Sequence, residues 1–249
     1  MKKIPTSSSQ AKSKRSAPVC RAASGRFGKA RTMRRFRDRL EAGRALAGLL
    51  AEFAGRRDVV VLALPRGGVP VAYEVAAALD APLDVFAVRK LGVPGHEELA
   101  MGAIASGGIE LLDTQLVDAL QVPRSDVLRI VERERRELER RQRLYRDHRP
   151  YPKIAGKTVL LIDDGLATGA SMYAALRALR KERPAKVVVA VPIAPSDTCT
   201  ALRQFADDVV CCQTPSPFGG VGAWYEDFTQ VSDAEVRDFL GRAALGQAS

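Results

Sequence analysis

Four short segments that are apolar at successive positions constrain the fold of this chain more than any other feature. They are 59-VVVLAL-64, 158-TVLLID-163, 186-KVVVAVP-192 and 208-DVVCC-212. A strand with one solvated face alternates polar and apolar residues, whereas continuous apolar runs are typical of parallel strands covered on both faces. Between these runs, apolar residues recur at helical spacing, as at Leu46, Leu49, Leu50 and Phe53 or at Met172, Ala175, Leu176 and Leu179. We predict an α/β fold with an open, mostly parallel twisted sheet flanked by helices.

The remaining elements are predicted from turn residues and charge pairs. We expect helices over 70–79 and 196–205, a strand over 83-LDVFAV-88, a mobile loop over 91–99, and a Gly-, Pro- and aromatic-rich tail after residue 212. Residues 100–113 predict a hairpin that turns at Gly107 and Gly108. Residues 125–147 predict a solvated or edge-packing helix capped by Ser125, with i, i+4 pairs at Glu132–Arg136, Glu137–Arg141 and Glu139–Arg143. The hairpin and the charged helix together form an expected insertion at about 97–150.

The positive charge of the chain is concentrated at its start. Residues 1–37 contain twelve Lys or Arg and no Asp or Glu, which leaves 27 basic and 29 acidic residues in 38–249. Residues 1–32 are rich in Ser, Lys and Arg, so we expect a disordered basic tail there and a folded domain over 33–249. Because that domain is nearly neutral, nucleic acid is not an expected partner.

Composition also limits the compartment and the metal chemistry. No apolar run approaches the roughly 18 residues that cross a bilayer, so no membrane partner is expected. The four cysteines lack CxxC spacing and the chain has two histidines, so neither a zinc site nor a disulfide framework is indicated. A reducing cytoplasm is the expected compartment, although an acid-poor, Arg- and Ser-rich start is also compatible with a transit peptide.

Two neighbouring carboxylates end the strand at 158–163. The segment 159-VLLIDDGLATGAS-171 runs from apolar residues into Asp163 and Asp164, and then into a loop of small and hydroxyl residues before a helix. Ligands of open parallel sheets bind beyond the carboxyl ends of strands, and adjacent like charges resist burial unless a metal or hydroxyl groups bind them. Small residues there let backbone N–H groups approach an anion at the helix N-terminus. The segment is not a Walker loop, and it predicts a site for a phosphate beside a diol, as in a phosphorylated ribose.

This thirteen-residue segment closely resembles the phosphoribosyl pyrophosphate signature of type I phosphoribosyltransferases. The resemblance implies that Asp163 and Asp164 are catalytic residues that bind the ribose hydroxyls, and that the same two residues are the metal ligands, with Mg²⁺ as the cofactor. It implies that the loop holds the 5′-phosphate, through Gly165, Ala167, Thr168, Gly169, Ala170 and Ser171. The implied reaction moves the 5-phosphoribosyl group from phosphoribosyl pyrophosphate to a nucleobase-like acceptor and releases pyrophosphate. A homodimer is compatible with it.

Two further segments are similar to the pyrophosphate-binding parts of the same family. The turn 64-LPRGG-68 occupies the position of a loop that binds pyrophosphate, often through a strained peptide bond, and it implies contacts from Arg66 and Gly67. A cis bond between Pro65 and Arg66 would be of the non-proline kind. The pair Arg89 and Lys90 resembles basic residues that meet the pyrophosphate. An ordinary turn and ordinary surface charges remain the alternatives.

The acceptor side of the resemblance rests on a loop and a hood. Residues 91–106 resemble the flexible loop that closes over the reacting centre, and 218-FGGVGAWYEDF-228 resembles a hood, expected at about 213–231, in which Trp224 stacks on the base. Packing of Trp224 in the core is the alternative. These segments together look like a group of bacterial phosphoribosyltransferases of unsettled substrate.

One loop position departs from the purine-salvage members. Members that use hypoxanthine and guanine usually carry Asp where this chain has Ala167, and the loop is closer to that of adenine-type members. If the base needs activation, Glu97 and Glu98 are the candidates, and Glu98 is taken as the catalytic one. Solvated loop charges are the alternative.

Two other classes of function stay open. A protein of this fold that senses nucleotides and binds RNA or DNA would account for the basic tail. A hydrolase or transferase that acts on another phosphosugar would use the same phosphate and diol contacts.

Overall fold

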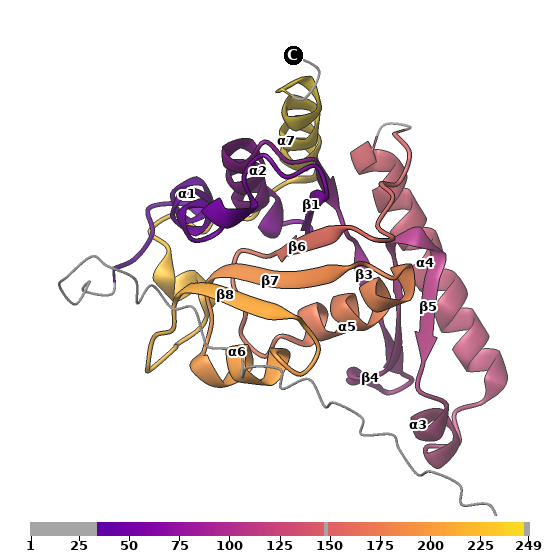
Figure 1. Ribbon diagram of the computed structural model, residues 1–249. Coiled ribbons are helices and arrows are strands. Elements are labelled where there is room, and N and C mark those ends of the chain that lie inside the picture. Colours follow the sequence, from indigo (N-terminus) through magenta and orange to yellow (C-terminus); the bar gives the residue numbers. More distant parts are fainter. Residues whose placement is uncertain (1–33, 147–148, 247–249) are drawn as a thin grey trace, which may run out of the picture.

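The predicted apolar strands form one parallel sheet. The computed structural model describes residues 34–146 and 149–246, and its main sheet has the strand order β2–β1–β6–β7–β8 (Figure 1). The strands are β1 (Val59–Ala63), β2 (Leu83–Val85), β6 (Thr158–Ile162), β7 (Lys186–Ile193) and β8 (Asp208–Gln213). All neighbouring pairs in this sheet are parallel, as the continuous apolar runs predict.

Helices cover both faces of this sheet (Figure 1). One face carries α1 (Arg39–Leu49), followed by the short η1 (Ala51–Phe53), together with α2 (Gly68–Leu79) and α7 (Asp233–Gly246). The other face carries α5 (Ala170–Leu179), the short η3 (Arg180–Glu182) and α6 (Ser196–Leu202). Successive residues of β1 point to opposite faces: Val61 packs with α1 and α2, and Leu62 packs with α5. Both faces are therefore dry, which is why the strands have no polar alternation.

A second, antiparallel sheet and two helices form the segment between the main strands β2 and β6. The elements are β3 (Val88–Val93), β4 (His96–Ala105), η2 (Ser106–Gly108), β5 (Ile109–Leu112), α3 (Thr114–Ala119) and α4 (Arg124–Arg146). The hairpin between β4 and β5 turns at Gly107 and Gly108, as predicted, and both have positive φ (81° and 74°). Helix α4 lies on this sheet, with Ile130 and Val131 in a buried cluster beside Met101.

Two predicted elements of this region are wrong. The single strand expected over 83–88 is divided, because the chain leaves the main sheet after Val85 and enters the second sheet at Val88. The loop expected over 91–99 is a β-hairpin, in which Leu91 and Val93 point into the apolar cluster under α4. The Gly and Pro residues that suggested a loop lie at a register irregularity and at the tight turn of this hairpin.

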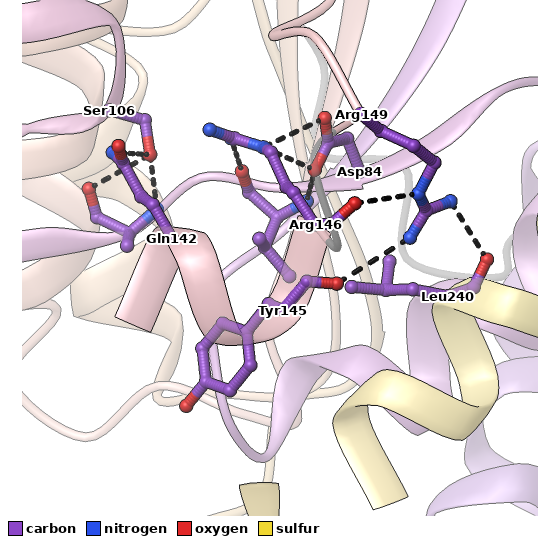
Figure 2. Close-up of polar contacts among 9 residues, drawn as sticks. Asp84, Ser106, Gln142, Tyr145, Arg146, Arg149 and Leu240 are labelled. Atoms are coloured by element: carbon purple, nitrogen blue, oxygen red, sulfur yellow. Dashed lines mark hydrogen bonds and ion pairs between the residues drawn. The ribbon is translucent and has the colours of Figure 1, made fainter. Parts of the chain in front are cut away.

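Helix α4 is held to the rest of the molecule by buried polar contacts (Figure 2). Arg146 donates from Nε to both carboxylate oxygens of Asp84 (3.0 and 3.1 Å) and from a terminal nitrogen to the carbonyl of Val85 (2.8 Å). Arg149 donates to the carbonyl of Leu240 in α7 (3.1 Å). Burial raises the pKa of Asp84 despite the attraction of Arg146. The helix thus packs on the second sheet, in agreement with the edge-packing alternative, and these polar contacts anchor its C-terminal end.

The ends of two helices also differ from expectation. Helix α4 begins at Arg124, so Ser125 lies within it and is not its N-cap, whereas the three predicted i, i+4 ion pairs are all present. Helix α7 occupies the segment expected as an irregular tail. A capping box starts it: the N–H of Glu235 donates to Ser232 Oγ (3.2 Å), and the N–H of Ser232 donates to Glu235 Oε2 (2.7 Å). The Ser-x-x-Glu spacing in the sequence is a signal from which this helix could have been predicted.

Candidate active site

Two turns meet at the carboxyl ends of neighbouring strands. Ala63 of β1 is in register with Ile162 of β6, and the N–H of Leu64 donates to the carbonyl of Ile162 (2.8 Å). The turn 64–67 therefore lies directly against the Asp163–Asp164 pair. A Cβ on Gly67 would collide with the carboxylate of Asp164, so this contact requires glycine.

The first turn contains a cis peptide bond between Pro65 and Arg66, of the non-proline kind that the sequence analysis considered. Helix α2 begins two residues later, at Gly68. The Arg66 side chain is about one-third exposed, and its guanidinium lies 3.8 Å from Asp233 Oδ1 at the start of α7. Asp233 in turn accepts a hydrogen bond from the Tyr145 hydroxyl (2.6 Å). The Arg66 guanidinium is thus oriented by Asp233 at the start of α7, and Tyr145 of α4 holds the same carboxylate.

The acid pair is partly buried and strongly perturbed. Asp163 Oδ1 accepts from the N–H of Asp164 (2.9 Å), and Asp164 Oδ2 accepts from Nε of Arg39 (2.8 Å). Burial and the neighbouring charge of Asp164 hold the pKa of Asp163 well above its ordinary value. Burial also raises the pKa of Asp164, and Arg39 opposes that effect. Two carboxylates held this way favour a ligand that supplies hydroxyl donors or positive charge.

The loop after the acid pair offers backbone donors at a helix N-terminus. Leu166 anchors it through an N–H donated to the carbonyl of Ile193 (2.9 Å), and Thr198 Oγ1 donates to the carbonyl of Ala167 (2.8 Å). Within the described residues, the N–H groups of Ala167, Thr168 and Gly169 donate to no acceptor. Helix α5 begins at Ala170 immediately after them, and four side chains here are exposed, those of Ala167, Thr168, Ala170 and Ser171. This arrangement fits an anion such as a phosphate.

The hood segment pairs with the first described residues of the chain. The N–H of Phe36 donates to the carbonyl of Trp224, and the N–H of Glu226 donates to the carbonyl of Phe36 (both 2.8 Å). The half-buried Trp224 indole donates to the carbonyl of Phe218 (2.8 Å). The buried Tyr225 hydroxyl donates to the backbone carbonyl of Asp164 (2.6 Å), which connects the hood to the acid pair.

Three residues of this site were missed by the sequence analysis. They are Arg39, Tyr225 and Phe228, which contact the acid pair or one another. Arg39 follows a segment with twelve basic residues, so its charge carries no distinguishing signal in the sequence. Tyr225 lies next to Trp224 in the same aromatic motif, and the choice between them depends on tertiary contacts.

Other candidate residues lie apart from the acid pair. Arg89 forms an ion pair with Glu134 of α4 (2.6 Å), and Lys90 lines a hollow of about 270 Å³ between the second sheet and α5. Glu97 is exposed on β4. Glu98 lies in the same strand, and its side chain is outside the described residues. No described contact joins any of these four residues to the acid pair.

The carboxylates at this site are better suited as ligands for magnesium than for a permanently bound transition metal. The described parts of the chain contain no group of three or more His, Cys, Asp or Glu that could hold a metal ion. Mg²⁺ commonly binds through one or two carboxylates together with substrate phosphates and water, and Asp163 and Asp164 fit that pattern.

Among the helices of the described residues, none combines the length and the apolar character needed to span a membrane.

Comparison with known proteins identifies the family. Residues 37–227 match the phosphoribosyl transferase domain. Proteins of Mycobacterium tuberculosis strains H37Rv and CDC 1551, whose names assign them provisionally to the phosphoribosyl transferases, are each 46% identical over 211 residues, or 85% of this chain and 47% of theirs. The chain therefore spans about half the length of the curated relatives it matches. The crystal structure of TT1426 from Thermus thermophilus is 45% identical, covers 83% of this chain and 97% of that one, and superposes with a TM-score of 0.73. From these matches and from the strand-end site, we conclude that the chain belongs to the phosphoribosyl transferase family.

Proposed function

We propose that this protein transfers the 5-phosphoribosyl group from phosphoribosyl pyrophosphate to a nucleobase-like acceptor, as a pentosyltransferase. One observation carries the proposal: the Pro65–Gly67 turn, the acid pair and the donor loop 167–169 converge at the ends of β1 and β6. The turn suits a pyrophosphate, the acid pair suits a diol, and the loop suits a phosphate. In the reaction, the bond from C1 of the ribose to a pyrophosphate oxygen breaks, and a bond from C1 to a ring nitrogen forms.

The donor is held by three groups of atoms. The N–H groups of 167–169, with the hydroxyls of Thr168 and Ser171, bind the 5′-phosphate at the start of α5. Asp163 and Asp164 accept hydrogen bonds from the ribose hydroxyls, and the same carboxylates would bind Mg²⁺. When bound, Mg²⁺ neutralises charge on the departing pyrophosphate. The chain contributes mainly by fixing the donor and by placing charge where the transition state develops it.

The pyrophosphate is met first by the turn at the end of β1. The backbone of Gly67 lies against the acid pair, and Arg66, the residue before it, supplies the positive charge for this contact. Lys90 has no acidic partner in the described part of the chain, so it is free to reach the pyrophosphate after movement of the β3–β4 hairpin. Arg89 would first have to leave Glu134, and we therefore place it behind Lys90.

The acceptor binds against the hood. Trp224 offers a half-buried ring for stacking, and Ala167 removes the carboxylate that hypoxanthine- and guanine-using relatives employ. Glu98, or its neighbour Glu97 on β4, supplies a base if the acceptor must lose a proton. The buried thiols of Cys199 and Cys211 are not joined in a disulfide, which supports a cytoplasmic setting.

The test is an acceptor panel. Purine and pyrimidine bases are each incubated with phosphoribosyl pyrophosphate, Mg²⁺ and the protein, and pyrophosphate release is measured. We expect release with at least one nucleobase-like acceptor, and a rise in Tm with the donor and Mg²⁺ alone. If neither occurs, while another phosphosugar raises Tm, the protein acts on that phosphosugar and the proposal is wrong.

A further inference from the structure

One buried guanidinium connects the acid pair to the hood. Arg39 donates from Nε to Asp164 Oδ2 and from a terminal nitrogen to the carbonyl of Thr229, both at 2.8 Å. Its guanidinium carbon lies 4.0 Å from the ring centroid of Phe228, a stacking distance. The Arg39 side chain is only 10% exposed. A single side chain thus contacts one strand-end carboxylate and two residues of the hood region, although Asp164 and Thr229 are 125 and 190 positions away.

The backbone around Arg39 is fixed on both sides. Asp38 caps α1 by accepting from the N–H of Glu41 (2.7 Å), and Arg39 is the first residue of that helix. On the other side, the N–H of Asp227 donates to the carbonyl of Arg37 (2.8 Å), next to the ladder at Phe36. The guanidinium therefore has a defined position without any ligand, which is the requirement for a group that orients another.

The contact with Arg39 occupies one oxygen of Asp164. Arg39 donates to Oδ2, and Gly67 lies against the carboxylate, whereas no Lys, Arg or backbone N–H in the described ranges donates to Oδ1. A ligand that binds Oδ1 would therefore not have to displace Arg39 from Oδ2. Arg39 therefore orients the Asp164 carboxylate through Oδ2 and does not occupy both of its oxygens.

We propose that Arg39 is a positioning residue of the donor site, which orients Asp164 so that Oδ1 accepts from a ribose hydroxyl and which holds the hood in register with that carboxylate. The inference rests on the proposed function, because it takes a phosphorylated pentose as the ligand. It assigns two separable effects to one side chain. The contact with Asp164 serves the donor, and the contact with Phe228 serves the acceptor.

Four variants separate these effects. Arg39→Gln removes the charge, and Arg39→Lys keeps the charge but loses the two-sided fork. Phe228→Leu removes the stacked ring and leaves the ion pair with Asp164. Arg44→Gln is the matched control, because Arg44 is also in α1 and is paired with Glu74 (2.9 Å), and it has no described contact with the acid pair.

The readout is donor affinity without acceptor, followed by the two Michaelis constants. Donor binding with Mg²⁺ is measured from Tm shifts and from fluorescence of Trp224, the single tryptophan of the chain. We expect the donor Kd to rise about tenfold in Arg39→Gln and by less in Arg39→Lys, and to stay unchanged in Arg44→Gln. In Phe228→Leu, the acceptor KM should rise while the donor Kd stays within about twofold.

The outcomes distinguish this inference from the proposed function. If the parent protein responds to the donor and Arg39→Gln binds it as tightly or more tightly, Arg39 is idle or blocking and the inference is wrong. If Arg39→Gln does not fold, an unchanged donor Kd in the charge-retaining Arg39→Lys overturns it equally. A parent protein that does not respond to the donor refutes the proposed function itself.

Discussion

At the scale of single residues, the buried carboxylates of the acid pair lower the stability of the fold, and we expect their role to be ligand binding. Asp163→Asn keeps the oxygen that accepts from the Asp164 N–H. It removes the ionisable carboxyl group, whose pKa is raised by burial. Because the native-state pKa lies above that of the unfolded chain, ionisation of Asp163 lowers the free energy of unfolding. This penalty is full above the native pKa, shrinks as the pH falls below it, and is absent below the pKa of the unfolded chain. We expect the variant to have the higher Tm, with the widest gap near pH 8 and a narrower gap near pH 5.

The measurement is thermal unfolding of both proteins across that pH range. Asp208→Asn is the control, since Asp208 accepts from the N–H of Val209 in the same local geometry (2.8 Å) and lies at the opposite end of a strand. A pH-independent gap, or a lower Tm in Asp163→Asn, would contradict the role of burial.

Asp164→Asn tests binding at the same pair. The substitution weakens both the charge-assisted bond from Arg39 and the acceptance of a ribose hydroxyl, so we expect kcat/KM to fall by at least about 100-fold. Donor affinity should fall far more than thermal stability. Pyrophosphate release and Tm are measured on the same preparation, and a rate equal to that of the parent would exclude the catalytic role.

At the residue scale, sequence patterns located those candidate site residues that lie in one local segment. The acid pair, the loop to Ser171 and the turn at Arg66 each lie within a few residues of a predicted strand end, and parallel pairing of β1 with β6 brings them together. Arg39 and Tyr225 act on Asp164 across 125 and 61 positions. No short-range pattern encodes such a contact, so these residues required the structure.

At the scale of elements, α4 shows how a polar helix is fixed in place. Arg146→Ala would leave Asp84 as a buried carboxylate without its partner, and breaking a buried pair costs about 3–5 kcal/mol of unfolding free energy. Arg143→Ala, on the same helix, removes an exposed pair with Glu139 (3.4 Å) and should cost at most about 0.5 kcal/mol. Urea unfolding of both variants gives the comparison, and equal losses would show that the contact in Figure 2 does not anchor the helix.

The strands that were predicted correctly are those buried on both faces of the sheet, because such strands are apolar at successive positions. The main strands have that pattern, and their helices were predicted with them. In the second sheet, Gly92, Pro94 and Gly95 interrupt the apolar pattern of the β3–β4 hairpin, so this hairpin resembled a loop. Helix α7 was missed because only Val236 and Leu240 are fully buried on it, too few to dominate a mixed sequence.

At the scale of the whole molecule, charge predicts which partners are absent. Residues 38–249 are nearly neutral, and most exposed arginines of α4 are paired with Glu on the same helix, so the domain offers little field to a polyanion. A chain that begins at Met33 should keep donor binding and should not bind RNA at physiological salt. Tm shifts and a filter-binding assay test both parts. RNA binding equal to that of the full chain would favour the regulatory alternative. The predicted tail over 1–32 lies outside the described residues.

The contact of Arg39 with Thr229 has a consequence for the order in which parts of the site form during synthesis. The acid pair and the phosphate loop leave the ribosome well before Thr229, which Arg39 needs to complete its contacts. A nascent chain would therefore hold its parallel strands while Asp164 still lacked the support of Arg39. Synthesis halted before residue 229 should yield a polypeptide that is partly folded yet lacks the proposed transferase activity.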